Sequence, residues 1–471
     1  MTAARPSVRP SARALTRNLA LFLLFNGLVL NGLLWLASPP GHRETVLHHS
    51  RDVFLGKGGD DSWGAMNFGL GHVESGSTTP LYSEIFFNRS VRFQYPPTAL
   101  FVLAGMRWAG PDRMRTSDLQ ILPWPTINDA LGWAFLLLTA AATAALFEQR
   151  LRQHHGPDEF RGLVIWRGLL VVGLALTFYP VVKAFTLGQI QVWLNALVAL
   201  ALLGWATGRK QLSGVLVGLI CLIKPHYSLI VLWGLLRREW RFSAVSAATI
   251  GAGLAASLAV FGWANHVDYL RVLAFLSERG EAYFPNQSVN GLLNRLMGIA
   301  RPEQYKSLEF LAGQFPPFNL WVYAVTLASS LAILAAALFR RKREGDPDRV
   351  FDFATIVVSC TIASPIAWEH HYGVLLPVYA IMLANALPSP RRMAWLAASY
   401  VLVSNFVPAA NLLAPTALNI AQSHLLVGAF ILLALLHRRP VAAGAPEAGQ
   451  RPMAGAPAFS GQARAQATRP A

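Results

Sequence analysis

The stretch from residue 210 to 241, KQLSGVLVGLICLIKPHYSLIVLWGLLRREWR, contains two apolar runs that meet at Lys224-Pro225 and end in a cluster of arginines. Proline breaks a helix because it lacks an amide hydrogen and clashes with the preceding turn. Such a break inside a membrane is tolerated only where protein or water surrounds the freed backbone. The stretch therefore predicts a membrane protein with a polar site close to this break.

The composition of the whole chain agrees with a membrane protein. Hydrophobic residues make up 54% of the 471 residues and charged residues only 14%, whereas soluble proteins contain about 25% charged residues. This excludes a soluble multidomain enzyme, a disordered protein and a disulfide scaffold. The formal charge is +16, but the basic residues form short clusters between apolar runs. This pattern is typical of cytoplasmic loops, so we expect no nucleic-acid partner.

Apolar runs of about 20 residues, the length needed to cross a bilayer, recur along the chain. Counting two shorter runs on either side of Lys224-Pro225, they predict an all-α polytopic membrane protein with about twelve transmembrane helices. The runs lie at about 18–37, 126–147, 163–182, 186–206, 211–224, 226–236, 242–263, 319–340, 350–366, 372–388, 393–412 and 421–437. The first run is long for a cleaved signal peptide and many spans follow it, so we expect an uncleaved helix.

The remaining segments complete the predicted topology. We expect a basic cytoplasmic N-terminus at 1–17, a membrane domain at 18–437 and a disordered cytoplasmic tail at 438–471. Two long loops, 38–95 and 264–318, are predicted to be periplasmic. Residues 96–109 are apolar but short, and we interpret them as a partial, re-entrant span.

Several polar residues of the first half are predicted to lie at the outer membrane face. Asp60 and Asp61 are candidates for a general base, although the pair taken alone is better explained as a solvated turn after Gly58-Gly59. Tyr95 precedes a proline pair at the start of the partial span. Gln189 follows a Leu-Gly pair at the end of an apolar run and is predicted to line a water-filled cavity or to bond a neighbouring helix.

Residues from 224 onward add further candidates on the same face. Lys224 either extends to the interface or binds an anion such as phosphate. In the second long loop, Asn286 and Gln287 offer amides to a sugar, and Arg295 offers positive charge to a phosphate. The densest cluster is Trp368-Glu369-His370-His371. Adjacent helical histidines point about 100° apart, so they do not readily chelate one metal ion, and we predict no metal site.

These polar groups come from distant parts of the sequence, yet the predicted topology places them all on the outer side. Convergent polar groups at one membrane face indicate one site.

The ordered set of motifs resembles glycosyltransferase family 87, the polyprenol-phosphate-mannose-dependent α-1,2-mannosyltransferase-like membrane proteins of bacteria. The motifs are the aspartate-containing first loop, LGQIQVWLNALVALAL, KPHYSLIVLWGLLRREWR, NQSVNGLLNRL and SPIAWEHHYGVLLP, and the resemblance covers about residues 15–437. It implies a C-type glycosyltransferase fold in the bacterial inner membrane. It also implies transfer of a sugar, with inversion, from a polyprenyl-phosphate donor to a lipid-linked or glycan acceptor at the periplasmic face.

The resemblance also implies roles for individual residues. Asp61 or Asp60 is the expected base, and His370 or His371 the expected contact of the donor phosphate. Lys224 and Arg295 are further phosphate partners, and we expect the remaining candidates to bind substrate: Tyr95, Gln189, Asn286, Gln287, Trp368 and Glu369. Two further acids nearby, Glu74 and Glu84, remain alternative candidates for the general base. The sequence names no cofactor and leaves the need for a divalent cation open.

One departure from the family pattern and two alternative functions remain. His226-Tyr227 follows the Lys-Pro pair where a glutamine or small polar residue is expected, which leaves the sugar open. A transporter or flippase of a lipid-linked sugar also uses a polar cavity among broken helices, but the two halves show no inverted repeat of broken helices. A non-catalytic membrane scaffold does not need clustered ionisable residues at this depth.

Overall fold

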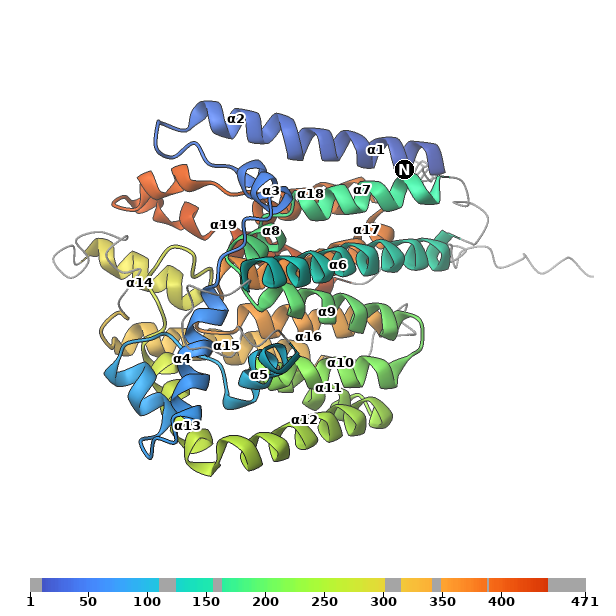
Figure 1. Ribbon diagram of the computed structural model, residues 1–471. Coiled ribbons are helices and arrows are strands. Elements are labelled where there is room, and N and C mark those ends of the chain that lie inside the picture. Colours follow the sequence, from blue (N-terminus) through green and yellow to red (C-terminus); the bar gives the residue numbers. More distant parts are fainter. Residues whose placement is uncertain are drawn as a thin grey trace, which may run out of the picture. The chain divides into compact units, whose positions relative to one another are not determined.

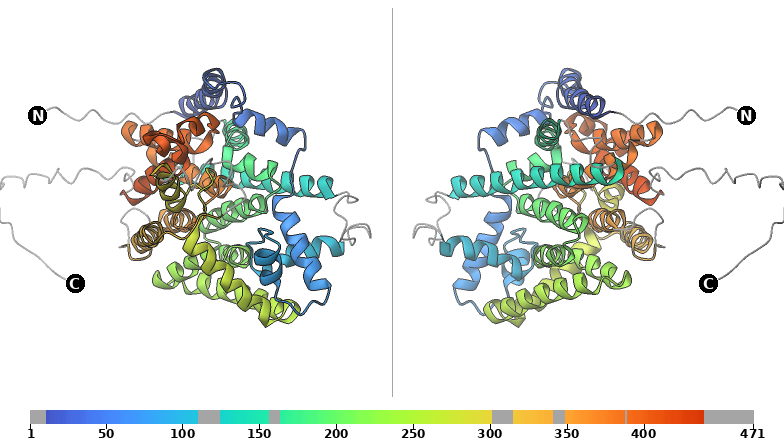
Figure 2. Two further views of the ribbon diagram at one scale, coloured as in Figure 1. Left: turned by 90° about the vertical axis from the view of Figure 1, so that its left-hand side faces the viewer. Right: turned by 90° about the vertical axis from the view of Figure 1, so that its right-hand side faces the viewer.

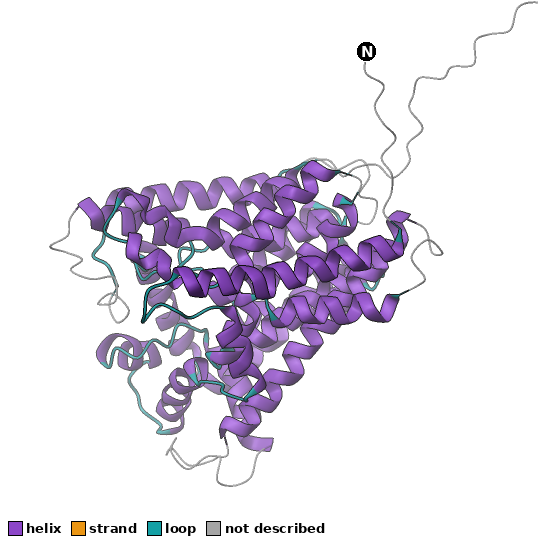
Figure 3. Cartoon of the chain, turned by 90° about the horizontal axis from the view of Figure 1, so that it is seen from above, coloured by secondary structure: helices purple, strands orange, loops and turns teal. Residues whose placement is uncertain are grey.

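The computed structural model describes residues 11–109, 124–155, 163–300, 315–340, 349–387 and 389–438. Its helices are α1 (Ala12–Leu24), α2 (Leu30–Ala37), α3 (Val46–Phe54), α4 (Asp61–Glu74), α5 (Leu100–Ala109), α6 (Trp124–His155), α7 (Val164–Leu176), α8 (Tyr179–Thr186), α9 (Gln191–Ala206), α10 (Lys210–Ile223), α11 (Leu229–Leu236), α12 (Trp240–Phe261), α13 (Trp263–Arg279), α14 (Val289–Ala300), α15 (Leu320–Leu338), α16 (Val350–Ile362), α17 (Leu375–Ala386), α18 (Pro390–Ser404) and α19 (His424–His437). Short 3₁₀ or π segments connect several of them. No strand occurs in the described ranges (Figure 3), so the all-α prediction is confirmed for them.

Five of the described helical segments are long and apolar enough to cross a membrane, and a sixth is obtained when the bent pair α7–α8 is counted as one span. The segments are Ala12–Ala37, Asn128–Gln153, Trp240–Phe261, Leu320–Leu338 and Ala417–His437. Several further apolar helices, including α9, α10 and α16, are shorter. A multi-pass membrane protein follows from these segments, whereas the count of about twelve crossings stays a prediction.

The long helices lie side by side, with α1 and α2 at one edge and α12 at the opposite edge (Figures 1 and 2). Every residue of α16 is buried, and α9 and α17 are buried along most of their length. In contrast, only 17% of the apolar window is buried in α12 and in α15. Central helices therefore form the core, and the edge helices present apolar side chains to their surroundings, as expected in lipid.

Both predicted long loops contain helices. The first loop, 38–95, includes α3 and α4, and the second, 264–318, includes most of α13 and all of α14. The helices α4, α13 and α14 lie together at one end of the long helices (Figure 1). Helix α5 has ten residues and a length of about 15 Å, too short to cross a bilayer of about 30 Å. Residues 110–123 after it lie outside the described part.

The termini test the domain boundaries only in part. Helix α1 begins at Ala12, within the predicted basic N-terminus 1–17. Residues 1–10 and 439–471, which include nearly all of the predicted tail, lie outside the described residues.

Basic clusters gather at the helix ends opposite to α4. Arg237 donates to Asp352 (2.5 Å), Lys210 donates to Glu239 (2.6 Å), and Arg340 donates to the carbonyls of Leu436 and His437 (both 3.0 Å). Lys210 begins α10 and Lys224 follows its end, so a helix of about 20 Å separates this basic end from the Lys-Pro break.

A buried ion pair joins α6 to α7. Both Nε and Nη2 of Arg167 donate to the carboxylate of Glu148, at 2.6 and 3.0 Å, and the Arg167 side chain has no exposed surface. Removing one partner of such a pair costs about 3–5 kcal/mol because the other charge stays buried alone.

We therefore predict that Arg167→Met lowers the melting temperature of the purified protein in detergent. The double variant Arg167→Met/Glu148→Met recovers most of the loss because no lone charge remains. Thermal unfolding followed by intrinsic fluorescence measures both. A double variant less stable than the single one would contradict this account of the pair.

Candidate active site

A polar cavity of about 520 Å³ lies where four helix ends meet. Its lining is Asp61, Ala65, Arg92, Gln94, Tyr95, Gln189, Ile223, Lys224, Pro225, His226, Tyr269, Leu273, Leu276, Ser277, Ser364, Pro365, Ile366, Trp368, His370 and His371. Seven of the twelve predicted site residues are among them: Asp61, Tyr95, Gln189, Lys224, Trp368, His370 and His371. The cavity thus joins sequence segments that are more than 300 residues apart.

Asp61 is placed by a backbone contact between α4 and the α8–α9 connection. The amide of Gly59 donates to the carbonyl of Thr186, and the amide of Asp61 donates to the carbonyl of Leu187, both at 3.0 Å. Gly188 follows in a left-handed conformation with φ +67°, and a Cβ atom there would lie 1.7 Å from the carbonyl oxygen of Gly59. Only glycine allows this approach.

A hydrogen-bond network fixes the Asp61 carboxylate. The Gln189 amide nitrogen donates to Asp61, while the Gln189 oxygen accepts from the hydroxyls of Ser62 (2.7 Å) and Tyr95 (2.9 Å). The two hydroxyls also contact each other at 3.0 Å, and the amide of Ile190 donates to Ser62 at 3.0 Å. These bonds leave Gln189 one orientation, with its N–H directed at the carboxylate.

Burial raises the pKa of the Asp61 carboxyl above its ordinary value, and the hydrogen bond from Gln189 opposes that rise. The carboxylate stays reachable by solvent through the cavity. A carboxylate that is open to a cavity and has a raised pKa has the properties of a general base.

Asp60 and the other acids proposed as bases lie elsewhere. The carbonyl of Asp60 accepts from the amides of Trp63 and Gly64 at the start of α4, and its side chain is not part of the cavity lining. Glu74 pairs with Arg107 and Glu84 with Arg89. Asp61 is the one carboxylate in the described lining.

Lys224 sits in extended backbone between α10 and the 3₁₀ helix η6 (Pro225–Ser228). The side chain is 8% exposed, and its ammonium donates to the oxygen of Gln191 at 2.7 Å. Gln191 in turn donates to Asn195 at 2.9 Å. The Lys-Pro break therefore directs the Lys224 ammonium into the cavity. Its hydrogen-bond partner, Gln191, is neutral, so no described ion pair compensates the charge of Lys224.

The histidines belong to a 3₁₀ helix, η8 (Glu369–Val374). The rings of His370 and His371 lie 4.7 Å apart at 90°, and both line the cavity. The Nδ1 atom of His371 accepts from the amide of Trp368 at 3.3 Å, which leaves its Nε2 directed away from the backbone.

The other candidates build the wall of the cavity. Asn286 forms an isolated bridge with Trp368, accepts from the amide of Ala367 (3.0 Å) and donates to the carbonyl of Pro365 (3.1 Å). Gln287 is fully buried, donates to the carbonyls of Phe284 and Gln422, and accepts at its own carbonyl from Tyr372. These bonds attach the segment before α14 to the histidine helix.

Arg295 and Glu369 are also buried outside the cavity lining. Arg295 donates to the carbonyls of Tyr283 and Asn286 and to the hydroxyl of Ser423. The Glu369 carboxylate accepts from the hydroxyl of Tyr179 at 2.7 Å. The predicted contact of these residues with substrate stays a prediction, and the geometry gives each a partner within the protein.

The sequence reasoning missed several lining residues, among them Arg92, Gln94, His226 and Ser277. Arg92 and Gln94 lie just before Tyr95. A cation so close to the Tyr-Pro-Pro motif could have been predicted to line the cavity. Tyr269 and Ser277 on α13 had none, because only folding brings α13 next to the cavity. In the described residues, no group of three histidine, cysteine or acidic side chains is arranged to hold a metal ion.

The sequence was then compared with known proteins. The family model of glycosyltransferase family 87 matches residues 93–365, more than half of the chain. The chain belongs to this family. It is therefore a glycosyltransferase. The matched region includes Gln189 and Lys224 but ends before His370 and begins after Asp61.

Three curated relatives of this family 87 enzyme are mycobacterial. A polyprenol-phosphate-mannose-dependent α-(1-2)-phosphatidylinositol mannoside mannosyltransferase of Mycolicibacterium smegmatis is 28% identical over 340 residues, which cover 68% of each chain. Two phosphatidylinositol pentamannoside mannosyltransferases with the same donor dependence are also similar. That of M. smegmatis is 28% identical (64% of each chain), and that of Mycobacterium tuberculosis 27% identical (64% of this chain, 62% of the relative). No solved structure matches the enzyme, so the C-type fold stays a prediction.

The contact at Gly188 predicts that Gly188→Ala reduces turnover by about a hundredfold, because a shift of about 1 Å at the base has effects of this size. Gly208→Ala is the matched control. Gly208 also has a positive φ of +78°, but no atom lies within 4 Å of its added Cβ. Initial rates of sugar transfer compare the two, and equal losses would show that strain alone is responsible.

The Asp61 network predicts a pH effect. Only the ionised carboxylate accepts a proton, so kcat/KM falls as the pH drops through the raised pKa of Asp61. Gln189→Leu removes the hydrogen bond that stabilises the ionised form and raises this pKa further. The acidic limb of the pH profile of kcat/KM therefore moves to higher pH in the variant. An unmoved limb would show that Asp61 does not set it.

Proposed function

We propose that the enzyme transfers a sugar, most simply mannose, from a polyprenyl-phosphate donor to a lipid-linked acceptor, with inversion at the anomeric carbon. The observation that supports this most directly is the polar cavity. It combines one carboxylate, Asp61, with a separate group of nitrogen donors, namely Lys224, His370 and His371. The names of the mycobacterial relatives agree with this donor and with a phosphatidylinositol mannoside acceptor.

The chemistry is a single displacement. Asp61 takes the proton of an acceptor hydroxyl, whose oxygen forms a bond to the anomeric carbon. The bond from that carbon to the phosphate oxygen breaks on the opposite face, and polyprenyl phosphate leaves with the electron pair. Lys224 and the histidines stabilise the negative charge on the leaving phosphate. A single carboxylate in the lining favours inversion, because a double displacement needs a nucleophile as well as a base.

The charge distribution supports a periplasmic or exterior site. The basic clusters at Lys210, Arg237 and Arg340 lie at the helix ends away from the Lys-Pro break, and such clusters mark the cytoplasmic side of membrane proteins. A donor anchored in the outer leaflet then reaches the cavity without a nucleotide-binding domain. We expect the inner membrane of a bacterium as the location.

The test is transfer of labelled mannose from polyprenyl-phosphate-mannose to membrane lipids by the purified enzyme in lipid nanodiscs. Asp61→Asn is expected to lose at least about a hundredfold in kcat and still to bind donor, whereas Asp60→Asn keeps most of the rate. His370→Ala/His371→Ala is expected to weaken donor use as well.

Other outcomes have defined meanings. Transfer from a different polyprenyl-phosphate sugar keeps the mechanism and replaces the donor. An active Asp61→Asn variant overturns the assignment of the base. A folded wild-type protein that transfers no polyprenyl-linked sugar supports the transporter alternative.

A further inference from the structure

Arg92 is a second cation of the polar cavity, and the sequence motifs do not mark it. It lies in a segment without regular secondary structure between the π-helical segment η2 (Ser83–Asn88) and Tyr95, and it lines the cavity together with Asp61 and Gln94. Its side chain is 25% exposed. Arg92 is therefore neither a typical surface arginine nor a core residue, and its position in the cavity needs an explanation.

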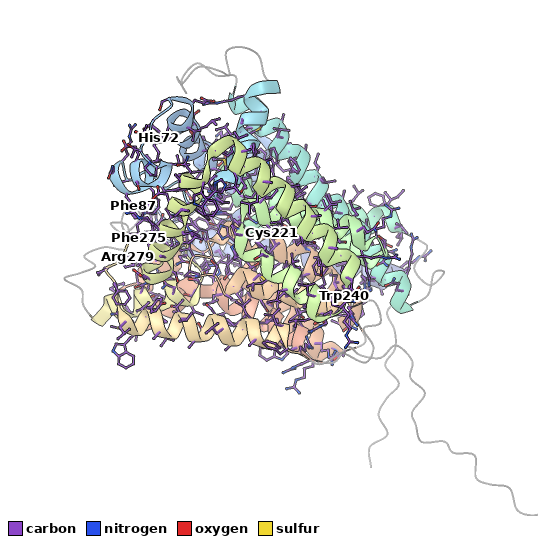
Figure 4. All side chains as sticks on the ribbon, turned by 90° about the horizontal axis from the view of Figure 1, so that it is seen from below. His72, Phe87, Cys221, Trp240, Phe275 and Arg279 are labelled. Carbon is purple, nitrogen blue, oxygen red and sulfur yellow. The ribbon has the colours of Figure 1, made fainter. Side chains whose placement is uncertain are left out.

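The guanidinium is held from two sides. Nη1 donates to Oε1 of Glu281 at 2.9 Å, and the side chain of Glu281 is 2% exposed. The guanidinium carbon also lies 4.8 Å from the ring centroid of Phe315, a cation–π contact. Phe315 packs against Phe275 and Phe86, with centroids 5.1 and 5.8 Å apart. Figure 4 shows Phe275 beside Phe87 and Arg279 at this end of the protein.

The position of Glu281 is itself fixed. It follows Gly280, which has a φ of +63°, and its carbonyl accepts from the Asn286 side chain at 2.8 Å. Asn286 is the residue that joins this segment to Trp368. The wall that carries the histidines therefore also fixes the carboxylate that orients Arg92.

One edge of the guanidinium stays unused. Nη2 of Arg92 is buried from solvent and has no hydrogen-bond partner among the described residues. A buried N–H without a partner is costly and rare. The side chain as a whole is 25% exposed and lines an open cavity, so an oxygen of a bound ligand can approach the guanidinium from the cavity.

The hydrogen-bond network places Arg92 on the side of the base. Tyr95, three residues after Arg92, donates to the Gln189 oxygen, and the Gln189 amide donates to Asp61. His370 and His371 belong to η8, and Lys224 lies at the break after α10. Because Asp61 takes its proton from the acceptor in the proposed reaction, groups beside Asp61 face the acceptor. The cations of the cavity are thus divided between two substrates.

We propose that Arg92 binds an anionic oxygen of the acceptor, a phosphate in a phosphorylated glycolipid, and so selects acceptors that carry a phosphate. The inference rests on the proposed function, because it uses Asp61 as the base. Arginine suits this role because its planar N–H groups match phosphate oxygens, and the Glu281 and Phe315 contacts fix its plane before the substrate arrives. Glu281 is then a positioning residue that acts through Arg92.

The test compares two acceptors with one donor, polyprenyl-phosphate-mannose. Phosphatidylinositol mannoside carries a phosphate, and octyl α-mannoside does not. We expect the wild type to favour the phosphorylated acceptor in kcat/KM, and Arg92→Gln to lose this preference by roughly tenfold to a hundredfold through KM. Rates are measured at a pH above the acidic limb, where Asp61 is ionised in both enzymes. There the use of octyl α-mannoside falls far less than the use of the phosphorylated acceptor, and the KM of the donor is unchanged. Arg92→Lys keeps the charge and retains part of the preference.

Arg89→Gln is the matched control. Arg89 lies three residues before Arg92 but is 57% exposed, pairs with Glu84 and does not line the cavity. We expect this variant to keep the acceptor preference. Melting temperatures of all variants show whether each one folds.

Three results would overturn the proposal. They are a preference that survives in Arg92→Gln, an equal loss with both acceptors, and a raised KM of the donor alone, which would assign Arg92 to the donor phosphate. If the wild type transfers to neither acceptor, the proposed function fails separately. Glycerophosphoinositol then serves as the probe: it is expected to raise the melting temperature of the wild type but not of Arg92→Gln, and equal shifts would reject the site.

Discussion

Where a helix breaks inside an apolar protein, its freed backbone N–H and C=O groups need hydrogen-bond partners. This requirement governs the structure. Three chain breaks, after α8, after α10 and after α16, interrupt apolar helices. In such surroundings a break is stable only when protein or water takes up its polar groups. Here the breaks come together around one cavity, where the loop before α4 bonds to the carbonyls of Thr186 and Leu187. The same interruptions that cost helix hydrogen bonds supply Gln189, Lys224 and His370.

The described residues that line the cavity form two groups, one around the base Asp61 and one of nitrogen donors. Asp61 receives its hydrogen bond from Gln189, which also accepts from Tyr95, while Lys224 and the histidines line the cavity from the break after α10 and from η8. The proposed inverting transfer needs this separation, because its base and its leaving phosphate act on opposite faces of the anomeric carbon. Buried supporting residues such as Asn286, Gln287 and Glu281 keep the two groups in place through bonds to backbone.

Much of the fold followed from hydropathy alone. The break at Lys224-Pro225 was predicted from one proline, and α10 ends at Ile223. The all-helical character of the described residues followed from apolar runs, because lipid requires internally bonded backbone. Helices within the long loops were not predicted, since α4 and α13 contain polar residues with weak periodicity that only packing against other helices stabilises.

The sequence by itself determined the membrane class, the family resemblance and seven of the twenty residues that line the cavity, because hydropathy and residue chemistry are local properties. Tertiary structure decided which of two adjacent aspartates faces the cavity, because one helical position turns a side chain by about 100°. It likewise placed Arg92 in the cavity lining and gave Arg295 hydrogen bonds to backbone carbonyls. These outcomes depend on contacts between segments that are far apart in the chain, and no local sequence pattern predicts such contacts.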